Sequence, residues 1–154
     1  MPEVGMGGRR SRNKGKRGER QLARWLRDRG YPEARRGLTQ SGGARECDVE
    51  GLPWWIECKT GQDAARVVLG ACRQAVRDTD GRPCLVVWRS QRVHSGPWGP
   101  WFVAVQGEAT DQPDTRGVAT VCRAGSGSFV AAGYRWTVHD AEGTLGHPGG
   151  FIGG

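Results

Sequence analysis

Hydrophobic positions in two segments recur at the spacing of one face of an α-helix. Residues 19–29 are good helix formers with three apolar side chains on one stripe, and Gly30 follows as a stop. In residues 62–78, apolar side chains stand at positions 64, 65, 68, 71, 72, 75 and 76. The pattern predicts a helix over each segment.

Short apolar runs elsewhere indicate strands. Residues 46–50 and 55–59 flank the turn formers Gly51 and Pro53, which favours a β-hairpin. The runs CLVVW (84–88) and WFVAV (101–105) have the composition of buried strands. The order helix, hairpin, helix, strand, strand indicates an α/β domain.

Both ends of the chain differ from this central part. Residues 1–17 have almost no apolar content and are expected to form a flexible basic arm, so that order begins at Gly18. The Gly-rich polar stretch 37–45 is expected to be a mobile basic loop. We therefore divide the chain into the arm, a core domain over 18–106, and an extension over 107–154.

The extension is rich in glycine, with 11 among its 48 residues. Its only plausible strands are 117–123 (GVATVCR) and 129–138 (FVAAGYRWTV). A β-appendage and a poorly ordered tail both remain open, and residues 143–154 are expected to be disordered. No role follows for this region.

Length and composition limit the class of protein. A chain of 154 residues corresponds to about one domain, and its seven tryptophans need burial or a partner. No apolar run approaches the roughly 18 residues of a membrane span, and no apolar segment of signal-peptide type follows the basic N-terminus. We expect a cytoplasmic protein without a membrane partner, whose five scattered cysteines are reduced thiols.

Positive charge is concentrated at one end of the chain. The net charge is +7, and residues 1–36 hold twelve Arg or Lys against four acids, whereas the remaining 118 residues are nearly neutral. A basic arm beside a neutral body is typical of a protein that binds a polyanion. Nucleic acid is favoured over a tail kept for solubility or for an acidic membrane surface.

The predicted hairpin carries the residues that indicate chemistry. Side chains alternate along a strand, so Glu57 and Lys59 share one face. If the turn uses residues 51–54, Asp48 lies directly opposite Glu57, with Cβ atoms about 5 Å apart. Two carboxylates at this separation repel each other, and a hard divalent cation relieves the repulsion. Mg²⁺ is the implied ion, and Mn²⁺ is expected to substitute for it.

Such a cation would bind a phosphodiester oxygen and a water, while Lys59 orients the water or offsets developing charge. The alternative is an exposed hairpin face on which Lys59 simply pairs with neighbouring acids. The three-residue pattern is short, but the apolar strand start, the upstream acid and the basic arm favour the first interpretation.

These residues resemble a known family. Glu19 in a helix after the basic segment KGKRGER, a Ser/Gly-rich loop with Ser41, then Asp48 and the Glu57-Cys58-Lys59 strand are similar to archaeal-type Holliday junction resolvases, which also occur in phages. The family belongs to the PD-(D/E)XK nuclease superfamily. The resemblance covers roughly residues 14–105 and implies a mixed sheet flanked by helices, a homodimer, and Mg²⁺-dependent cleavage of four-way DNA junctions.

The resemblance also implies roles for single residues. Asp48 and Glu57 would be metal ligands, Lys59 the catalytic lysine, and Glu19 a further acid near the metal. Ser41 would lie in the loop that approaches the junction backbone.

Other features of the resemblance are less direct. Gln74 resembles a glutamine that many superfamily nucleases place near the site, although it also fits an ordinary helix surface. Glu19 likewise fits the favourable first turn of a helix, and Ser41 fits plain loop chemistry. Cys47 stands where the superfamily motif has proline, and the segment after residue 106 has no recognisable counterpart.

Together these observations predict a metal-dependent, structure-selective endonuclease that resolves four-way junctions, located in the host cytoplasm if phage-encoded. Two alternatives stay open: another PD-(D/E)XK nuclease with restriction-like, repair or exonuclease activity, and a non-catalytic basic DNA-binding protein. DNA contact is expected through phosphates rather than bases, because no base-reading module is visible. The residues expected to make it are Arg9, Arg10, Arg12, Lys14, Lys16, Arg17, Arg20 and Arg45.

Overall fold

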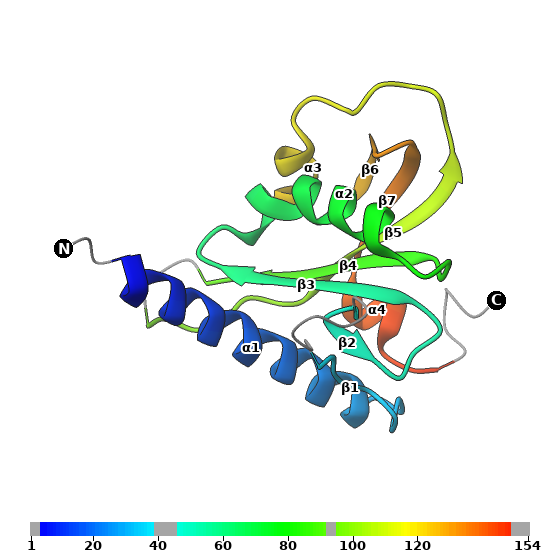
Figure 1. The fold of residues 1–154 in the computed structure, drawn as a ribbon. Helices are drawn as coiled ribbons and strands as arrows, with labels where there is room; N and C mark the ends of the chain where they lie inside the picture. Colours follow the sequence, from blue (N-terminus) through cyan, green and yellow to red (C-terminus); the bar gives the residue numbers. More distant parts are fainter. Residues whose placement is uncertain (1–3, 39–45, 92–94, 149–154) are drawn as a thin grey trace.

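The computed structural model describes residues 4–38, 46–91 and 95–148, and for residues 4–14 the backbone alone. Its centre is a mixed seven-stranded sheet in the order β1-β2-β3-β4-β5-β7-β6 (Figure 1). Among the strands of the described ranges, only β3 and β4 are parallel, and the other neighbours pair antiparallel. The expected α/β class with a mixed sheet flanked by helices is confirmed.

Twelve elements are formed by the described residues. They are α1 (Val4–Asp28), β1 (Arg35–Arg36), β2 (Val49–Glu50), β3 (Trp55–Gly61), the 3₁₀ turn η1 (Ala64–Val67), α2 (Val68–Asp78), β4 (Cys84–Ser90), β5 (Phe102–Ala109), α3 (Val118–Ala124), β6 (Gly127–Ala131), β7 (Tyr134–Asp140) and α4 (Ala141–Leu145).

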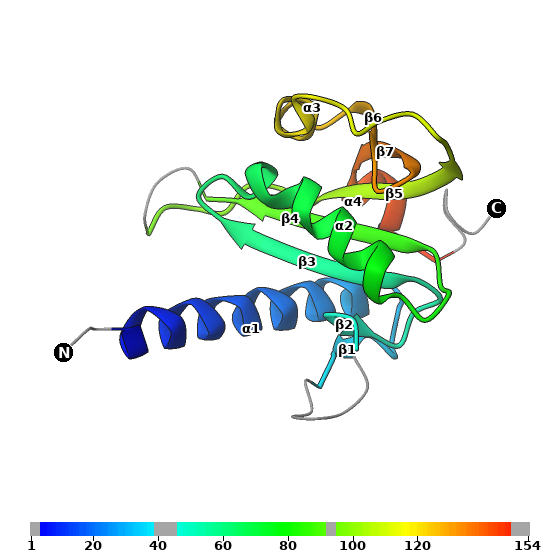
Figure 2. The same cartoon turned by 45° about the horizontal axis from the view of Figure 1, so that its top comes forward.

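Helices cover both faces of the sheet. Figures 1 and 2 show α1 on one side and α2 with α3 on the other. One buried cluster joins α1 and α4 to the sheet through residues such as Leu22, Ile56 and Leu145. The second joins α2 and α3 to the opposite face through residues such as Cys72 and Trp88. The period of two along the strands thus divides the core into two apolar layers.

The central elements follow the sequence pattern. The predicted helix over 62–78 is present as η1 followed by α2, and the run 84–88 begins β4. The connection from β3 through α2 to β4 is a βαβ unit, because parallel neighbours need a crossover of this kind. The hairpin is present as β2 and β3.

Several expectations about the ends of the chain are wrong. Residues 4–17 belong to α1 and are helical rather than a flexible arm, and α1 extends beyond the end of β3 in both views (Figures 1 and 2). The segment 127–140 forms two strands of the main sheet rather than a separate appendage. Residues 143–148, expected to be disordered, continue α4 and its exit.

The predicted strand over 117–123 is instead the helix α3. Its buried residues Val118 and Cys122 are four apart, a spacing that fits one helical face as well as one face of a strand. Gly117 and Gly125 decide between the two, because both adopt left-handed backbone at the helix ends, with φ of 76° and 74°.

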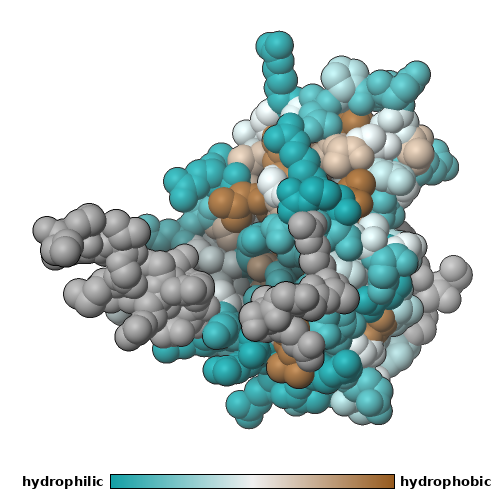
Figure 3. Space-filling model, viewed as in Figure 1, coloured by the Kyte–Doolittle hydropathy of each residue, from teal (hydrophilic) through white to brown (hydrophobic). Residues whose placement is uncertain are grey.

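The outer surface is mostly polar. The face shown in Figure 3 is largely hydrophilic, with hydrophobic side chains in small separate patches. None of the helices in the described residues combines the length and the apolar character that crossing a bilayer requires.

Candidate functional site

The β2–β3 hairpin brings two acids face to face. Val49 pairs with Ile56, which confirms the predicted turn over residues 51–54. The N–H of Asp48 also donates to the carbonyl oxygen of Ile56, at 2.9 Å, so the regular pairing ends there and the expected direct pairing of Asp48 with Glu57 is wrong. The two carboxyl groups are nevertheless in contact. Gly51 makes the turn possible, because its φ is 91° and a Cβ there would overlap with the carbonyl oxygen of Glu33.

Arg82 ties the turn of the hairpin to the start of β4. Its guanidinium lies 3.2 Å from a carboxylate oxygen of Glu50 and 3.0 Å from one of Asp80. It also donates to the carbonyl oxygens of Leu52 and Trp54, at 3.2 and 3.4 Å. These contacts hold the hairpin against the sheet, and no feature of the local sequence pattern indicated them.

Asp48 lies just before β2, and its backbone is bonded on both sides: its N–H donates to the carbonyl oxygen of Ile56 and its carbonyl oxygen accepts from the N–H of Gly37, both at 2.9 Å. The backbone N–H of Cys58 in β3 donates to Oδ2 of Asp48 at 2.8 Å. A side-chain carboxylate therefore takes the place that a backbone carbonyl would hold in a continuing strand. This bond fixes the Asp48 carboxylate against β3, where it also contacts Glu57 and Glu19.

Glu57 is buried, with 2% of its surface exposed. The indole N–H of Trp55 donates to Oε1 at 3.1 Å, whereas Oε2 is buried and accepts no hydrogen bond from the described residues. Burial, together with the negative charge of Asp48, raises the pKa of Glu57 to about 8. The exposed hairpin face considered as an alternative does not describe this side chain.

Glu19 reaches the same place from α1. Gly18 allows the helix to pass close to the end of β3, since a Cβ there would lie 2.8 Å from Oγ1 of Thr60. Burial and the adjacent Asp48 raise the pKa of Glu19 to about 7, and the guanidinium of Arg36, 3.7 Å from Glu19, partly opposes the shift. Asp48 is thus in contact with both glutamates, one from each side of the sheet. We call Glu19, Asp48 and Glu57 the carboxylate cluster.

Lys59 completes the group. It follows Glu57 by two residues in β3 and so projects on the same face. Its positive charge lowers the pKa of Glu57, against the larger upward effects of burial and Asp48. The lysine is only partly buried, whereas Glu57 is buried.

The carboxylate oxygens of the cluster suit a hard divalent cation, although they do not form a complete set of metal ligands by themselves. In the described part of the chain, no three His, Cys, Asp or Glu side chains are placed so that they could hold a metal ion as they stand. Mg²⁺ sites use only one or two carboxylates, and water and substrate phosphate supply the rest. The unpaired Oε2 of Glu57 beside Asp48 meets that need.

Other predicted site residues are less tightly placed. Gln74 is half-buried in α2 and takes part in none of the interactions described for the carboxylate cluster. Ser41 and Arg45 lie outside the described residues. Lys16, Arg17 and Arg20 are exposed on α1, next to Glu19 in sequence. The side chains of Arg9, Arg10, Arg12 and Lys14 are outside the described part, and their backbone belongs to α1.

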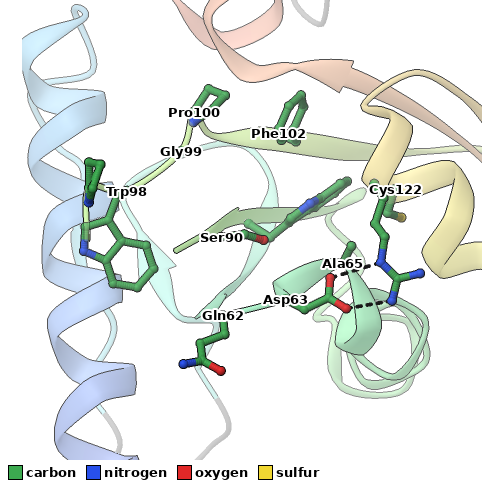
Figure 4. A pocket seen from close by; sticks show the side chains of 12 residues that line it. Gln62, Asp63, Ala65, Ser90, Trp98, Gly99, Pro100, Phe102 and Cys122 are labelled. Atoms are coloured by element: carbon green, nitrogen blue, oxygen red, sulfur yellow. Dashed lines mark hydrogen bonds and ion pairs between the residues drawn. The ribbon is translucent and has the colours of Figure 1, made fainter. Parts of the chain in front are cut away.

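Sequence reasoning missed a second feature close to the carboxylate cluster. A pocket of about 810 Å³ opens at the end of β4, between η1, α3 and the segment 97–100 (Figure 4). Its wall includes the indoles of Trp88 and Trp98 and the ring of Phe102. The aromatic and Pro/Gly-rich composition of residues 97–102 was the available signal.

Comparisons of the chain with protein-family models, with curated proteins and with solved structures found no match.

Proposed function

We propose that this protein is a Mg²⁺-dependent DNA endonuclease with a PD-(D/E)XK core, and that it resolves four-way junctions by paired phosphodiester hydrolysis. The observation that supports the proposal most is the meeting of Asp48 and the buried, incompletely satisfied Glu57 on one hairpin, with Lys59 beside them. Clusters of acids with perturbed pKa values are typical of catalytic sites.

The side chains take distinct parts in the proposed reaction. Asp48 and Glu57 would hold the cation, and Glu19 adds a third carboxylate from the side of α1. When bound, the cation supplies positive charge that stabilises the phosphodiester as negative charge develops. The Lys59 ammonium lies on the same face and would stabilise the same charge or orient the attacking water.

Exposed cations near the carboxylate cluster support a DNA substrate. Lys16, Arg17 and Arg20 lie on α1 directly around Glu19, so a DNA backbone that they bind passes the acids. Contacts of this kind recognise backbone and shape rather than base sequence. A homodimer would present two such sites at a fixed separation, which suits the two-fold symmetry of a four-way junction.

The test is cleavage of a synthetic four-way junction in Mg²⁺, with EDTA as control and linear duplex, flap and single strand as competing substrates. Paired symmetric nicks confined to the junction are expected. Asp48→Asn should reduce turnover at least about 100-fold while junction binding survives. Asp111→Asn, the same change at an exposed loop position, is the matched control.

Two other outcomes of this experiment would each favour one of the alternative functions. Cleavage of linear duplex or free ends as fast as junctions would indicate another nuclease of this superfamily. Binding without any Mg²⁺-dependent cleavage would leave a non-catalytic DNA-binding protein.

A further inference from the structure

The pocket beside the carboxylate cluster has flat, aromatic walls. Trp88 and Phe102 come from neighbouring strands, and their rings stack at a centroid distance of 6.1 Å. Figure 4 shows Trp98 on one side of the pocket and Asp63 on the other. Asp63 accepts a hydrogen bond from Arg123. Because Trp88 is only 1% exposed, the half-buried rings of Phe102 and Trp98 are the ones against which a planar ligand can stack.

The side chain of Arg89 holds Trp98 in place. The guanidinium of Arg89 lies 4.9 Å from the Trp98 ring and 4.4 Å from the Trp101 ring. Arg89 also donates a hydrogen bond to the side chain of Gln21 in α1. These contacts fix the indole of Trp98 at the pocket wall before any ligand arrives, which reduces the entropic cost of binding.

The charged side chains that line the pocket balance each other, and one further cation lies close to them. The carboxylate of Asp63 lies 2.6 Å from a guanidinium nitrogen of Arg123, so its charge is already balanced. The nearby Arg66 also lowers the pKa of Asp63 and is exposed. Proteins that bind single-stranded nucleic acid combine aromatic side chains with nearby cations, and Arg66 is such a cation here.

The sheet sets the position of the pocket relative to the acids. Trp88 is the register partner of Lys59 across the parallel β3–β4 pair. Neighbouring strands are about 5 Å apart, and Glu57 lies two residues before Lys59 on the same face. A DNA strand whose backbone crosses the carboxylate cluster therefore places a nearby base at the pocket.

We propose that this pocket binds an unpaired nucleobase of the strand that lies across the carboxylate cluster. The inference rests on the proposed nuclease function and narrows its substrate class to four-way junctions in which a base at the branch point is unpaired. Trp98 stacks on the base, and the amide of Gln62 at the pocket edge hydrogen-bonds to the base edge. In a perfectly paired duplex every base is paired, so the duplex binds through its backbone alone.

The test compares base-specific binding with total binding in EDTA, so that no cleavage occurs. The full-length chain is titrated into two DNA junctions that carry 2-aminopurine, one with the probe unpaired at the branch and one with it in a paired arm. We expect the fluorescence of the unpaired probe to change on binding, because stacking alters its emission. Trp98→Ala should abolish that change and weaken binding about tenfold, with affinity for the paired junction unaltered.

Two further variants separate stacking from folding. Trp98→Phe keeps an aromatic face and should retain most of the signal. Gln62→Ala changes an exposed residue and should weaken binding of the unpaired base about fivefold without affecting stability. Trp25→Ala is the matched control, since Trp25 is a half-buried tryptophan stacked by Arg29 at 4.0 Å and is not part of the pocket wall.

The inference is overturned if Trp98→Ala binds both junctions as the wild type does, or weakens both equally. It is also overturned if the variant changes only the molar mass of the protein in solution, because the pocket would then be a contact between copies. Failure of the nuclease proposal looks different: wild type would not cut in Mg²⁺, although the 2-aminopurine signal and its loss in Trp98→Ala would persist.

Discussion

The carboxylate cluster should make the protein without divalent cations less stable as pH rises. Folding raises the pKa of Glu57 from about 4.5 to about 8, so the folded state holds a proton that the unfolded state releases. A group of this kind stabilises the fold below its unfolded pKa and loses that contribution as pH rises through the folded value. The affected window is therefore about pH 4.5 to 8.

The size of the effect follows from the shift. Each pKa unit corresponds to about 1.4 kcal/mol, so the Glu57 shift sets an upper limit of about 5 kcal/mol. Water penetration and local relaxation reduce such penalties, and Glu19 shares the repulsion from Asp48 rather than adding independently. We expect Glu57→Gln to be more stable than wild type by about 2 to 3 kcal/mol at pH 8 and nearly equal to it at pH 4.5.

The substitution is well matched to the site. A glutamine carbonyl still accepts the hydrogen bond from the Trp55 indole, and its amide takes the place of the unpaired Oε2 beside Asp48. The loss of negative charge is then the main change. Glu108→Gln, at an exposed position of β5, makes the same chemical change where no burial acts.

Thermal unfolding of both variants and the wild type across pH 4.5 to 8, in EDTA, measures the effect. For a chain of this length, 2 to 3 kcal/mol corresponds to about 5 to 10 °C in melting temperature. Mg²⁺ at ten times its dissociation constant should restore about 1.4 kcal/mol to wild type at pH 8 and much less to Glu57→Gln. Equal melting temperatures of wild type and Glu57→Gln at pH 8 would refute the reasoning about the cluster.

Three further outcomes are expected. Lys59→Ala should reduce junction turnover at least about 100-fold with little change in junction affinity, measured by single-turnover cleavage and anisotropy. Deleting residues 1–13, which removes three arginines, should weaken DNA affinity more at low salt than at high salt, and a loss independent of salt would contradict a phosphate-binding role. Gly51→Ala should lower the free energy of unfolding by about 2 to 4 kcal/mol, and Gly81→Ala by only about 1, because both glycines have positive φ but only a Cβ at Gly51 meets backbone.

Sequence alone predicted the parts of the fold that local rules determine. The turn over residues 51–54, which Gly51 permits, is readable in 13 residues, and it brings Asp48 close to Glu57. The irregular pairing at Asp48, whose N–H donates to Ile56, was not readable there. The helix over 62–78 has enough repeats of its apolar spacing to be distinguished from a strand. Segments of seven residues, such as α3, carry too few repeats for that distinction.

Local rules could not predict the parts of the site in which segments far apart in the sequence meet. The approach of Glu19 to Asp48 depends on how α1 crosses the end of β3, and only the family resemblance indicated it before the structure placed the two side chains together. The pocket around Trp98 needs four elements between residues 62 and 123 to meet. No periodicity within one segment encodes that meeting, so the pocket was missed.

The environment of Glu57 argues against a purely structural role for the acids. A glutamate in a purely structural position is either solvated or fully paired, because an unsatisfied buried carboxylate oxygen costs stability. Glu57 is neither: its side chain lies beneath the surface, one oxygen has no donor among the described residues, and a second acid stands against it. Trp55 and Val86 surround it with a well-packed apolar layer that tolerates this cost. A buried acid without full hydrogen bonding is expected at a site that binds a cation. The bound cation would offset the cost of burying the negative charge, which folding alone does not.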